Sequence, residues 1–210
     1  MFTQQQLHMP QSHVHELNQF FEVKDHMLTV QDDNARKMLS MEQHNWPKHC
    51  VDLLLHQMGV TLDKDHMIKI DETSKKSTQP PHADKGPGWH TVIVPLRWYD
   101  PVYTVMFEQY YHGTYFRGYK YRPSGKQMYE KEWLSQDHDA VHGLTGQPFD
   151  QNHYQRYFYG TCDAEDFHGL TVHSVAQWQQ GQGIWFAGNQ LHAGSSFQLS
   201  KRWLVVHWEE

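Results

Sequence analysis

Short segments of β-strand character recur from residue 60 to the end of the chain, and they constrain the fold more than any other feature. Each is rich in β-branched and aromatic residues and is bounded by glycine, proline or polar turn residues. The expected strands span residues 67–70, 90–98, 103–109, 170–178, 184–186 and 203–208. Many short strands separated by turns are typical of a β-barrel or a β-sandwich. We therefore expect a mainly β core.

The part of the chain before residue 60 has a different, helical character. We expect an irregular or locally helical arm over residues 1–24, a short strand over 26–31, and a helix over 32–41 that Asp32 to Asn34 cap at its start. A second helix should begin at Pro47 and end at Gly59. Its apolar residues recur at helical spacing, at Cys50, Val51, Leu54, Leu55 and Met58. We expect the helical region 32–59 to pack against one face of the sheet.

Composition excludes several classes of protein. A chain of 210 residues is long enough for one domain with a sizeable core, so we expect a single domain over residues 1–210. The net charge of -6 and the pI of about 6.3 argue against general binding to nucleic-acid backbones. No apolar run is long enough to span a membrane, and the Gln-rich N-terminus does not resemble a signal peptide. With only two cysteines, the chain is expected to be cytoplasmic.

Three residues are candidate metal ligands. With 18 histidines, a His-x-Asp tripeptide such as His82-Ala83-Asp84 arises easily by chance, so its context decides. On an extended segment, side chains at positions i and i+2 point the same way and can occupy adjacent positions on one metal ion. A third ligand, His192, follows an apolar strand and a Gly-Asn turn in the segment GIWFAGNQLH. Two histidines and one carboxylate, with open positions beside them, are diagnostic of non-haem Fe(II) oxygenases.

A basic residue lies ten positions after the last candidate ligand. Arg202 opens the final expected strand, and its guanidinium is well suited to bind a carboxylate. We expect Arg202 to face the far end of a ligand bound at the metal. Lys201 is a rival that should point to the opposite face of the strand, and so should His207, which follows Arg202 by an odd number of residues. His207 and the strand histidines His90, His112 and His173 are expected to be hydrogen-bonded core or rim residues.

The order of these residues resembles the Fe(II)/2-oxoglutarate-dependent dioxygenase superfamily, over roughly residues 67–210. The resemblance implies a double-stranded β-helix, a jelly-roll or cupin-like barrel with the N-terminal helices packed on one sheet. It implies that His82, Asp84 and His192 hold Fe(II) and that Arg202 binds the C5 carboxylate of 2-oxoglutarate, with ascorbate as a possible reductant. The expected reaction hydroxylates a substrate and releases succinate and CO2. Halogenating members replace the carboxylate ligand with a small residue, so Asp84 favours hydroxylation.

Two other functions stay open. A cupin-like metalloenzyme of similar shape would use another co-substrate or none, and Arg202 argues against it. A non-catalytic binding module would keep only the fold, and the intact set of three ligands argues against that. The substrate is not identified by the sequence, and neither is a second partner for the 2-oxoglutarate carboxylate.

The region 110–168 is interpreted as an insertion, irregular except for an expected helix over 126–136. We expect it to line or cover the mouth of the pocket with aromatics such as Tyr115, Tyr119 and Tyr121, and to be more mobile than the strands. The alternative is that it packs on the outer sheet, far from the metal. Its first part, residues 110–126, alternates basic and aromatic residues and could bind nucleic acid. A hairpin with buried aromatics is the alternative, and the net acidity of the chain favours it.

Overall fold

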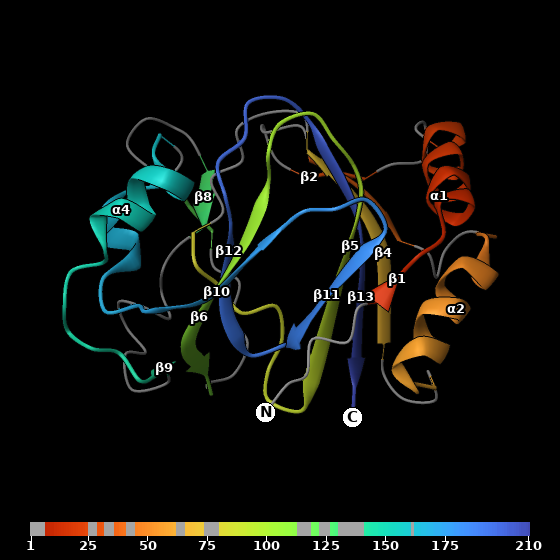
Figure 1. Ribbon diagram of the computed structural model, residues 1–210. Helices are drawn as coiled ribbons and strands as arrows, with labels where there is room; N and C mark the ends of the chain where they lie inside the picture. The colour runs from red at the N-terminus through yellow and green to blue at the C-terminus, as the bar shows by residue number, and fades with distance from the viewer. Residues whose placement is uncertain are drawn as a thin grey trace.

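Two antiparallel β-sheets face each other in the computed structural model (Figure 1). The structure describes residues 7–24, 29–31, 36–40, 45–61, 66–73, 80–112, 119–121, 127–129, 141–160 and 162–210. The larger sheet has seven strands. Their order across the sheet is β1 (Leu7–His8), β11 (Gln182–Ala187), β5 (Trp89–Trp98), β13 (Lys201–Glu209), β4 (His66–Thr73), β3 (Arg36–Ser40) and β2 (Thr29–Gln31).

The smaller sheet is built around one long strand, β6. Its strands are β10 (Val172–Gln177), β6 (Tyr103–Tyr111) and β12 (Gln190–Gly194), and β9 (Val141–His142) pairs with the end of β6. A separate hairpin joins β7 (Tyr119–Tyr121) and β8 (Gln127–Tyr129). Every pairing in both sheets is antiparallel, so the core is mainly β, as the sequence predicts.

Two helices cover the outer face of the larger sheet, on the right in Figure 1. They are α1 (Gln11–Val23) and α2 (Lys48–Met58), and α2 ends at Gly59, whose φ of 69° is left-handed. Leu17 and Leu54 from the helices are fully buried against Val94 and Leu204 of the sheet. Complete burial of one aliphatic side chain stabilises the folded state by about 1.5–3 kcal/mol, so this layer is a main source of stability.

The larger sheet contacts this helical layer with one face and the smaller sheet with the other. Successive side chains on a strand point to opposite faces. In β13, the even-numbered Leu204, Val206 and Trp208 contact the helical layer. The odd-numbered Trp203 and Val205 belong instead to the cluster between the two sheets. Both faces of β13 are therefore buried, and neither of them is exposed to solvent.

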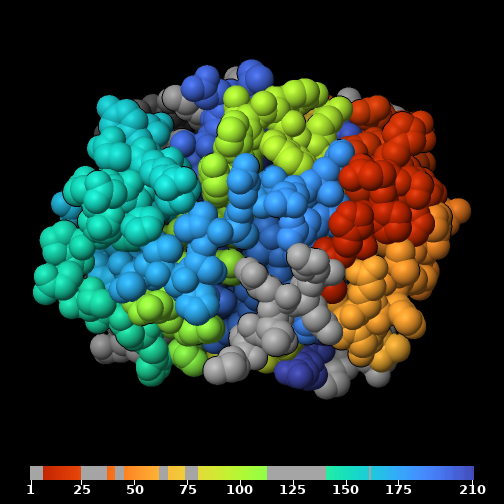
Figure 2. All heavy atoms as spheres, viewed as in Figure 1, coloured from red at the N-terminus to blue at the C-terminus, as the bar shows by residue number. Residues whose placement is uncertain are grey.

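A third buried layer covers the outer face of the smaller sheet, on the left in Figure 1. It is formed by three short helical segments: α4 (Gln151–His153), the π-helix η4 (Tyr154–Phe158) and the 3-10 helix η5 (Ala164–Phe167). Phe158 and Phe167 stack with ring centroids 4.2 Å apart and pack near Phe107 of β6. Figure 2 shows the helical layers on opposite sides of the molecule, with the sheets between them.

The six expected strands and the helix after Pro47 are confirmed, but the helix expected over 32–41 is wrong. Arg36–Ser40 is strand β3, which pairs with β2 on one side and with β4 on the other. Residues 32–35, which include the expected cap, lie outside the described residues. Asp and Asn favour turns as strongly as they favour helix caps. Pairing with two neighbouring strands therefore overrides a weak local signal for a helix.

The helix expected over 126–136 is also wrong in the part that the structure describes. Gln127–Tyr129 is strand β8, and residues 130–136 lie outside the described residues. The arm over residues 1–24 contains the 13-residue helix α1, which is longer than the local helicity expected there. Among the described helices, none is both long and apolar enough to cross a membrane.

Candidate metal centre

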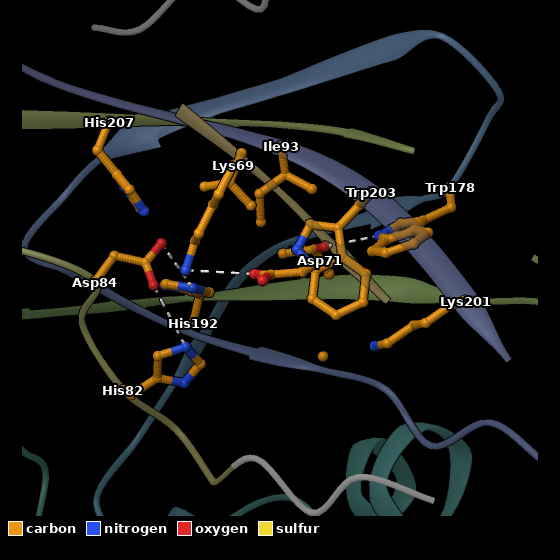
Figure 3. Close-up of a pocket in the computed structure, with 13 residues that line it drawn as sticks. Lys69, Asp71, His82, Asp84, Ile93, Trp178, His192, Lys201, Trp203 and His207 are labelled. Atoms are coloured by element: carbon orange, nitrogen blue, oxygen red, sulfur yellow. Dashed lines mark hydrogen bonds and ion pairs between the residues drawn. The ribbon is translucent and has the colours of Figure 1, made fainter. Parts of the chain in front are cut away.

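A pocket of about 50 Å³ lies between the two sheets, and all three predicted metal ligands line it (Figure 3). The larger sheet contributes side chains from β4, β5 and β13, and the smaller sheet contributes side chains from β6 and β12. The lining residues are Lys69, Asp71, His82, Asp84, Ile93, Thr104, Trp178, His192, Gly194, Lys201, Trp203, Val205 and His207.

The main chain fixes the spacing of the two histidine ligands. The N–H of His82 donates to the carbonyl of His192 at 3.0 Å, and the N–H of His192 donates to the carbonyl of His82 at 2.9 Å. Residues that exchange both hydrogen bonds in this way lie directly opposite each other on antiparallel segments. Their rings are consequently adjacent, with centroids 4.4 Å apart.

Hydrogen bonds also orient the two rings. The Nδ1–H of His82 donates to the carbonyl of Pro80 at 2.9 Å, and the Nδ1–H of His192 donates to the carbonyl of Gln190 at 3.1 Å. Because a carbonyl can only accept, Nδ1 carries a proton in both rings, and Nε2 is the nitrogen that each ring can offer to a metal. In metal-binding histidines, the ring nitrogen that does not bind the metal usually donates a hydrogen bond, which fixes the orientation of the ring.

The Nε2 atoms of both rings face the carboxylate of Asp84. Nε2 of His82 lies 3.6 Å from Oδ1, and Nε2 of His192 lies 3.5 Å from Oδ2. All three ligand atoms lie within 4.8 Å of one another. Octahedral coordination at about 2.1 Å places neighbouring ligand atoms about 3.0 Å apart. Both distances to Asp84 are longer than this and involve different carboxylate oxygens, so the side chains would shift to seat one divalent ion. The three donors are of the types that Fe(II) takes, and the residues fit the group that the sequence implies.

The charge state of Asp84 suits a metal ligand. Burial favours the neutral carboxyl and raises its pKa, but the opposing influence of His192 and other basic groups is stronger. The net result is a pKa well below the usual range of an aspartate. Asp84 is therefore ionised at neutral pH and offers a negative ligand without first losing a proton.

His207 lines the pocket, contrary to the prediction that it faces away. Its Nδ1 lies 2.9 Å from the hydroxyl of Thr91, so it is hydrogen-bonded, as expected for a core histidine. Burial lowers the pKa of His207 to about 4, although the charge of Asp84 acts in the opposite direction. His207 is therefore neutral at physiological pH.

We expect His207 to make the metal-free protein sensitive to mild acid. Its folded-state pKa is below its unfolded value of about 6.5, so between about pH 6.5 and pH 4 the unfolded state binds more protons. The free energy of unfolding should fall by about 2–3 kcal/mol as the pH drops through this window. Urea unfolding in EDTA measures this, and His207→Asn should remove most of the drop. An equal drop in His207→Asn and in the half-exposed control His153→Gln would contradict the assignment.

Two pocket residues were missed by the sequence reasoning, Lys69 and Asp71. They lie two positions apart on β4, so both point between the sheets, and Nζ of Lys69 lies 3.3 Å from Oδ2 of Asp71. Both are almost fully buried. The signal was present in the sequence: two charged residues alternate with Ile68 and Ile70, which is unusual for a central strand with two covered faces.

Lys201 lines the pocket on the same face of β13 as Trp203 and His207. Its ammonium lies 4.5 Å from the ring centroid of Phe197, 5.1 Å from that of Trp178 and 5.3 Å from that of Trp203. Cation–π contacts of this kind hold a buried cation in an otherwise apolar wall. Gly194 allows the close approach, because a Cβ at that position would lie 3.1 Å from the lysine nitrogen.

Arg202 does not line the pocket, which corrects the prediction that it faces the metal. Its side chain is 3% exposed and points to the opposite face of β13, toward helix α1. Nε and Nη2 contact Oε2 of Glu72 at 2.9 and 2.7 Å, and Nη1 donates to Oδ1 of Asn18 at 3.0 Å. The guanidinium also lies 4.2 Å from the ring centroid of Phe21. Arg202 therefore joins the sheet to the helical layer.

The described part of the insertion packs away from the pocket. Val141, Phe149, Tyr157, Phe158 and Phe167 are buried on the outer face of the smaller sheet. No residue of 141–160 or 162–168 lines the pocket. For these residues the alternative interpretation, that they pack on the outer sheet away from the metal, therefore agrees with the structure. Tyr115 lies outside the described residues, and the side chains of Tyr119 and Tyr121 are not described.

No protein-family model and no curated protein sequence matches this chain. Among solved structures, HygX from Streptomyces hygroscopicus, with nickel and 2-oxoglutarate bound, overlaps with 95% of this chain and 79% of its own, at 10% identity and a TM-score of 0.49. The non-heme alpha ketoglutarate dependent epimerase SnoN from nogalamycin biosynthesis overlaps with 94% and 73%, at 8% identity and 0.47. A Pseudomonas putida prolyl-4-hydroxylase overlaps with 99% and 92%, at 9% identity and 0.43. At these values, the reaction has to be inferred from this chain's own residues.

Proposed function

We propose that this protein is a non-haem, Fe(II)- and 2-oxoglutarate-dependent oxygenase built on a double-stranded β-helix. The observation that carries the proposal is the convergence of His82 Nε2, Asp84 and His192 Nε2 on one point of a buried pocket. Two imidazoles and one carboxylate would hold Fe(II) and leave coordination positions for other ligands. When bound there, the iron would supply the coupling of 2-oxoglutarate decarboxylation by O2, which gives succinate and CO2, to hydroxylation of a second substrate.

The residues of the chain hold and shield the reacting groups. The paired main chains of residues 82 and 192 fix the ligand spacing, and Pro80 and Gln190 hold the ring tautomers. Phe186 lies against the ring of His192, at a centroid distance of 4.5 Å, and excludes water from that side. Water exclusion strengthens each electrostatic contact inside the pocket and limits side reactions.

Lys201 takes the role that the sequence assigned to Arg202. It is a lysine on the pocket face of β13, and its ammonium lies among the rings of Phe197, Trp178 and Trp203. A carboxylate that reaches this end of the pocket would form a charge-assisted hydrogen bond with the ammonium, which is about twice as strong as a neutral one. Lys69 also lines the pocket, on β4, where it contacts Asp71. We therefore assign the C5 carboxylate of 2-oxoglutarate to Lys201.

The proposal predicts release of succinate that depends on both Fe(II) and 2-oxoglutarate. Protein prepared without oxygen should be mixed with Fe(II), ascorbate and 2-oxoglutarate, with panels of amino acids, peptides, nucleosides and lipids as substrates. Succinate is then quantified by mass spectrometry. We expect slow uncoupled release without substrate and faster release with the correct substrate class. Heat-denatured protein with the same iron controls for reactions of free metal.

Binding measurements in parallel separate the proposal from the two alternatives. If the protein binds Fe(II) but neither binds nor consumes 2-oxoglutarate, it is a cupin-like metalloenzyme with another co-substrate. If it binds no Fe(II) at the His82, Asp84 and His192 site, it is a binding module that keeps only the fold.

A further inference from the structure

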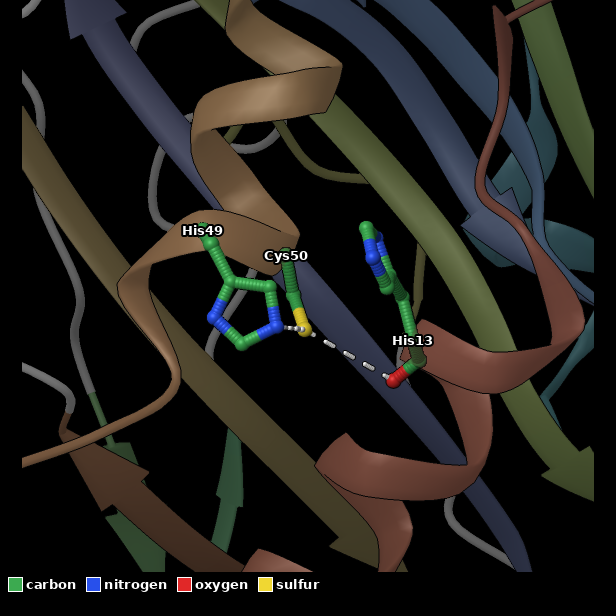
Figure 4. Close-up of side chains that lie close together, drawn as sticks. All are labelled: His13, His49 and Cys50. Carbon is green, nitrogen blue, oxygen red and sulfur yellow. Dashed lines mark hydrogen bonds between the residues drawn. The ribbon is translucent and has the colours of Figure 1, made fainter.

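A second group of metal-binding side chains lies on the opposite side of the larger sheet, between α1 and α2 (Figure 4). His13 and Glu16 are one turn apart on α1, and His49 and Cys50 are in the first turn of α2. Ligand atoms of His13, His49 and Cys50 lie within 4.8 Å of one another. None of these residues belongs to the pocket between the sheets.

The distances in this group match the edges of a tetrahedron around zinc. Sγ of Cys50 lies 3.5 Å from Nε2 of His49 and 3.6 Å from Oε2 of Glu16, and these last two atoms are 3.0 Å apart. With zinc bonds of about 2.3 Å to sulfur and about 2.0–2.1 Å to nitrogen or oxygen, tetrahedral edges are about 3.5 Å and about 3.3 Å. Three donor atoms are therefore already placed for one ion.

His13 supplies the fourth donor. Its ring is perpendicular to that of His49, with centroids 5.1 Å apart. Its Nδ1 is buried and makes no hydrogen bond within the described residues. Buried polar atoms are nearly always satisfied, so one that is not needs an explanation, and an ion is one. A metal bound through Nδ1 would satisfy it.

A catalytic thiol is the rival interpretation, and the geometry argues against it. In a nucleophilic thiol–imidazole–carboxylate relay, the thiol and the carboxylate contact opposite nitrogens of the ring. Here Cys50 and Glu16 both contact Nε2 of His49.

We propose that His13, Glu16, His49 and Cys50 bind one zinc ion that joins α1 to α2. The set contains one thiolate, two imidazoles and one carboxylate, all of them ligands that zinc accepts in tetrahedral sites. The side chains of His49 and Glu16 are 59% and 44% exposed, so an ion reaches the site from solvent. Four protein ligands leave no open position, so the role is structural. The ion would hold together the two helices that cover the larger sheet.

Cobalt(II) gives a test that is specific for this site. The ligands proposed in the pocket are nitrogen and oxygen, so a thiolate-to-cobalt charge-transfer band in the near ultraviolet distinguishes the helical site from the pocket. Metal-free native protein, titrated with Co(II), should develop this band within two equivalents, because the pocket can take one ion, together with the intense visible bands of a four-coordinate ion. Zn(II) should then displace the cobalt and abolish the band.

Variants assign the band to its residues. Cys50→Ser should abolish it, and His49→Gln should weaken the binding of cobalt at least about tenfold. The other free cysteine provides the matched control, so Cys162→Ser should keep the band unchanged. Zinc should raise the thermal unfolding midpoint of the native protein and of Cys162→Ser, but less in His49→Gln, which changes an exposed residue and should fold. No band in native protein, or a band that persists in Cys50→Ser, would overturn the proposal.

Discussion

Asp84→Asn is expected to weaken Fe(II) binding by at least about 100-fold and to abolish succinate release. The substitution keeps the shape of the side chain but removes the only negative charge among the three proposed ligands. Loss of groups that merely support a metal ligand already costs about 10–100-fold in affinity or activity, so loss of a ligand charge should cost more. The measurement is anaerobic Fe(II) titration by calorimetry.

The pocket itself offers the control for this experiment. Asp71→Asn makes the same chemical change in the same pocket, but Asp71 lies on β4, forms an ion pair with Lys69 and is not one of the three proposed ligands. It should change Fe(II) affinity by only a few-fold, although it will lower stability by leaving Lys69 less well compensated. If both variants lose iron equally, pocket charge rather than coordination by Asp84 controls binding.

Lys201→Met should weaken 2-oxoglutarate binding by about 30-fold to several thousand-fold while leaving Fe(II) binding intact. Methionine keeps a flexible apolar stem among the rings of Trp178, Phe197 and Trp203 but removes the charge. Losing one partner of a buried, charge-assisted pair costs about 2–5 kcal/mol, which gives the expected range. The dissociation constant for 2-oxoglutarate is measured by calorimetry with Mn(II) in place of iron.

The adjacent Arg202 gives the opposite pattern of effects. Arg202→Met should leave 2-oxoglutarate binding unchanged within a few-fold, because its guanidinium contacts Glu72 and helix α1. It should instead lower the free energy of unfolding by about 3 kcal/mol, since among the described residues Glu72 then keeps Arg97 alone as an ionic partner. If Lys201→Met leaves the dissociation constant for 2-oxoglutarate unchanged, Lys201 does not bind its C5 carboxylate. A large loss of 2-oxoglutarate affinity in Arg202→Met would show instead that Arg202 binds it.

The contrast between these two residues shows where sequence reasoning stops. Strand alternation correctly placed residues 202 and 207 on opposite faces of β13, but it did not indicate which face is the pocket. On a strand with one solvated face, the polar residues would have answered this question. Here Trp203 and Val205 are as apolar as Leu204 and Val206, because both faces are buried. The ten-residue separation between His192 and Arg202 did not predict the face of Arg202 either. The loop between β12 and β13 interrupts the alternation of side chains from one strand to the next.

Other parts of the site were predictable because they depend on local geometry. The i, i+2 spacing of His82 and Asp84 puts both side chains on one side of an extended segment, whatever surrounds it. The strand and turn before His192 were equally visible in the sequence. The group between α1 and α2 was not found, because its four residues come from two helices whose relative position only the fold determines. The packing of residues 141–168 on the outer sheet depends on tertiary contacts in the same way.

The reciprocal main-chain bonds between residues 82 and 192 have a consequence for how this chain can diverge. They close a loop that contains β5, β6 and the whole of 110–168, and they set the ligand spacing at the point of closure. Because loop closure costs little more for a longer loop, the connections between the strands of this loop can lengthen or shorten at small energetic cost. The spacing of the two histidines can stay constant while those connections change.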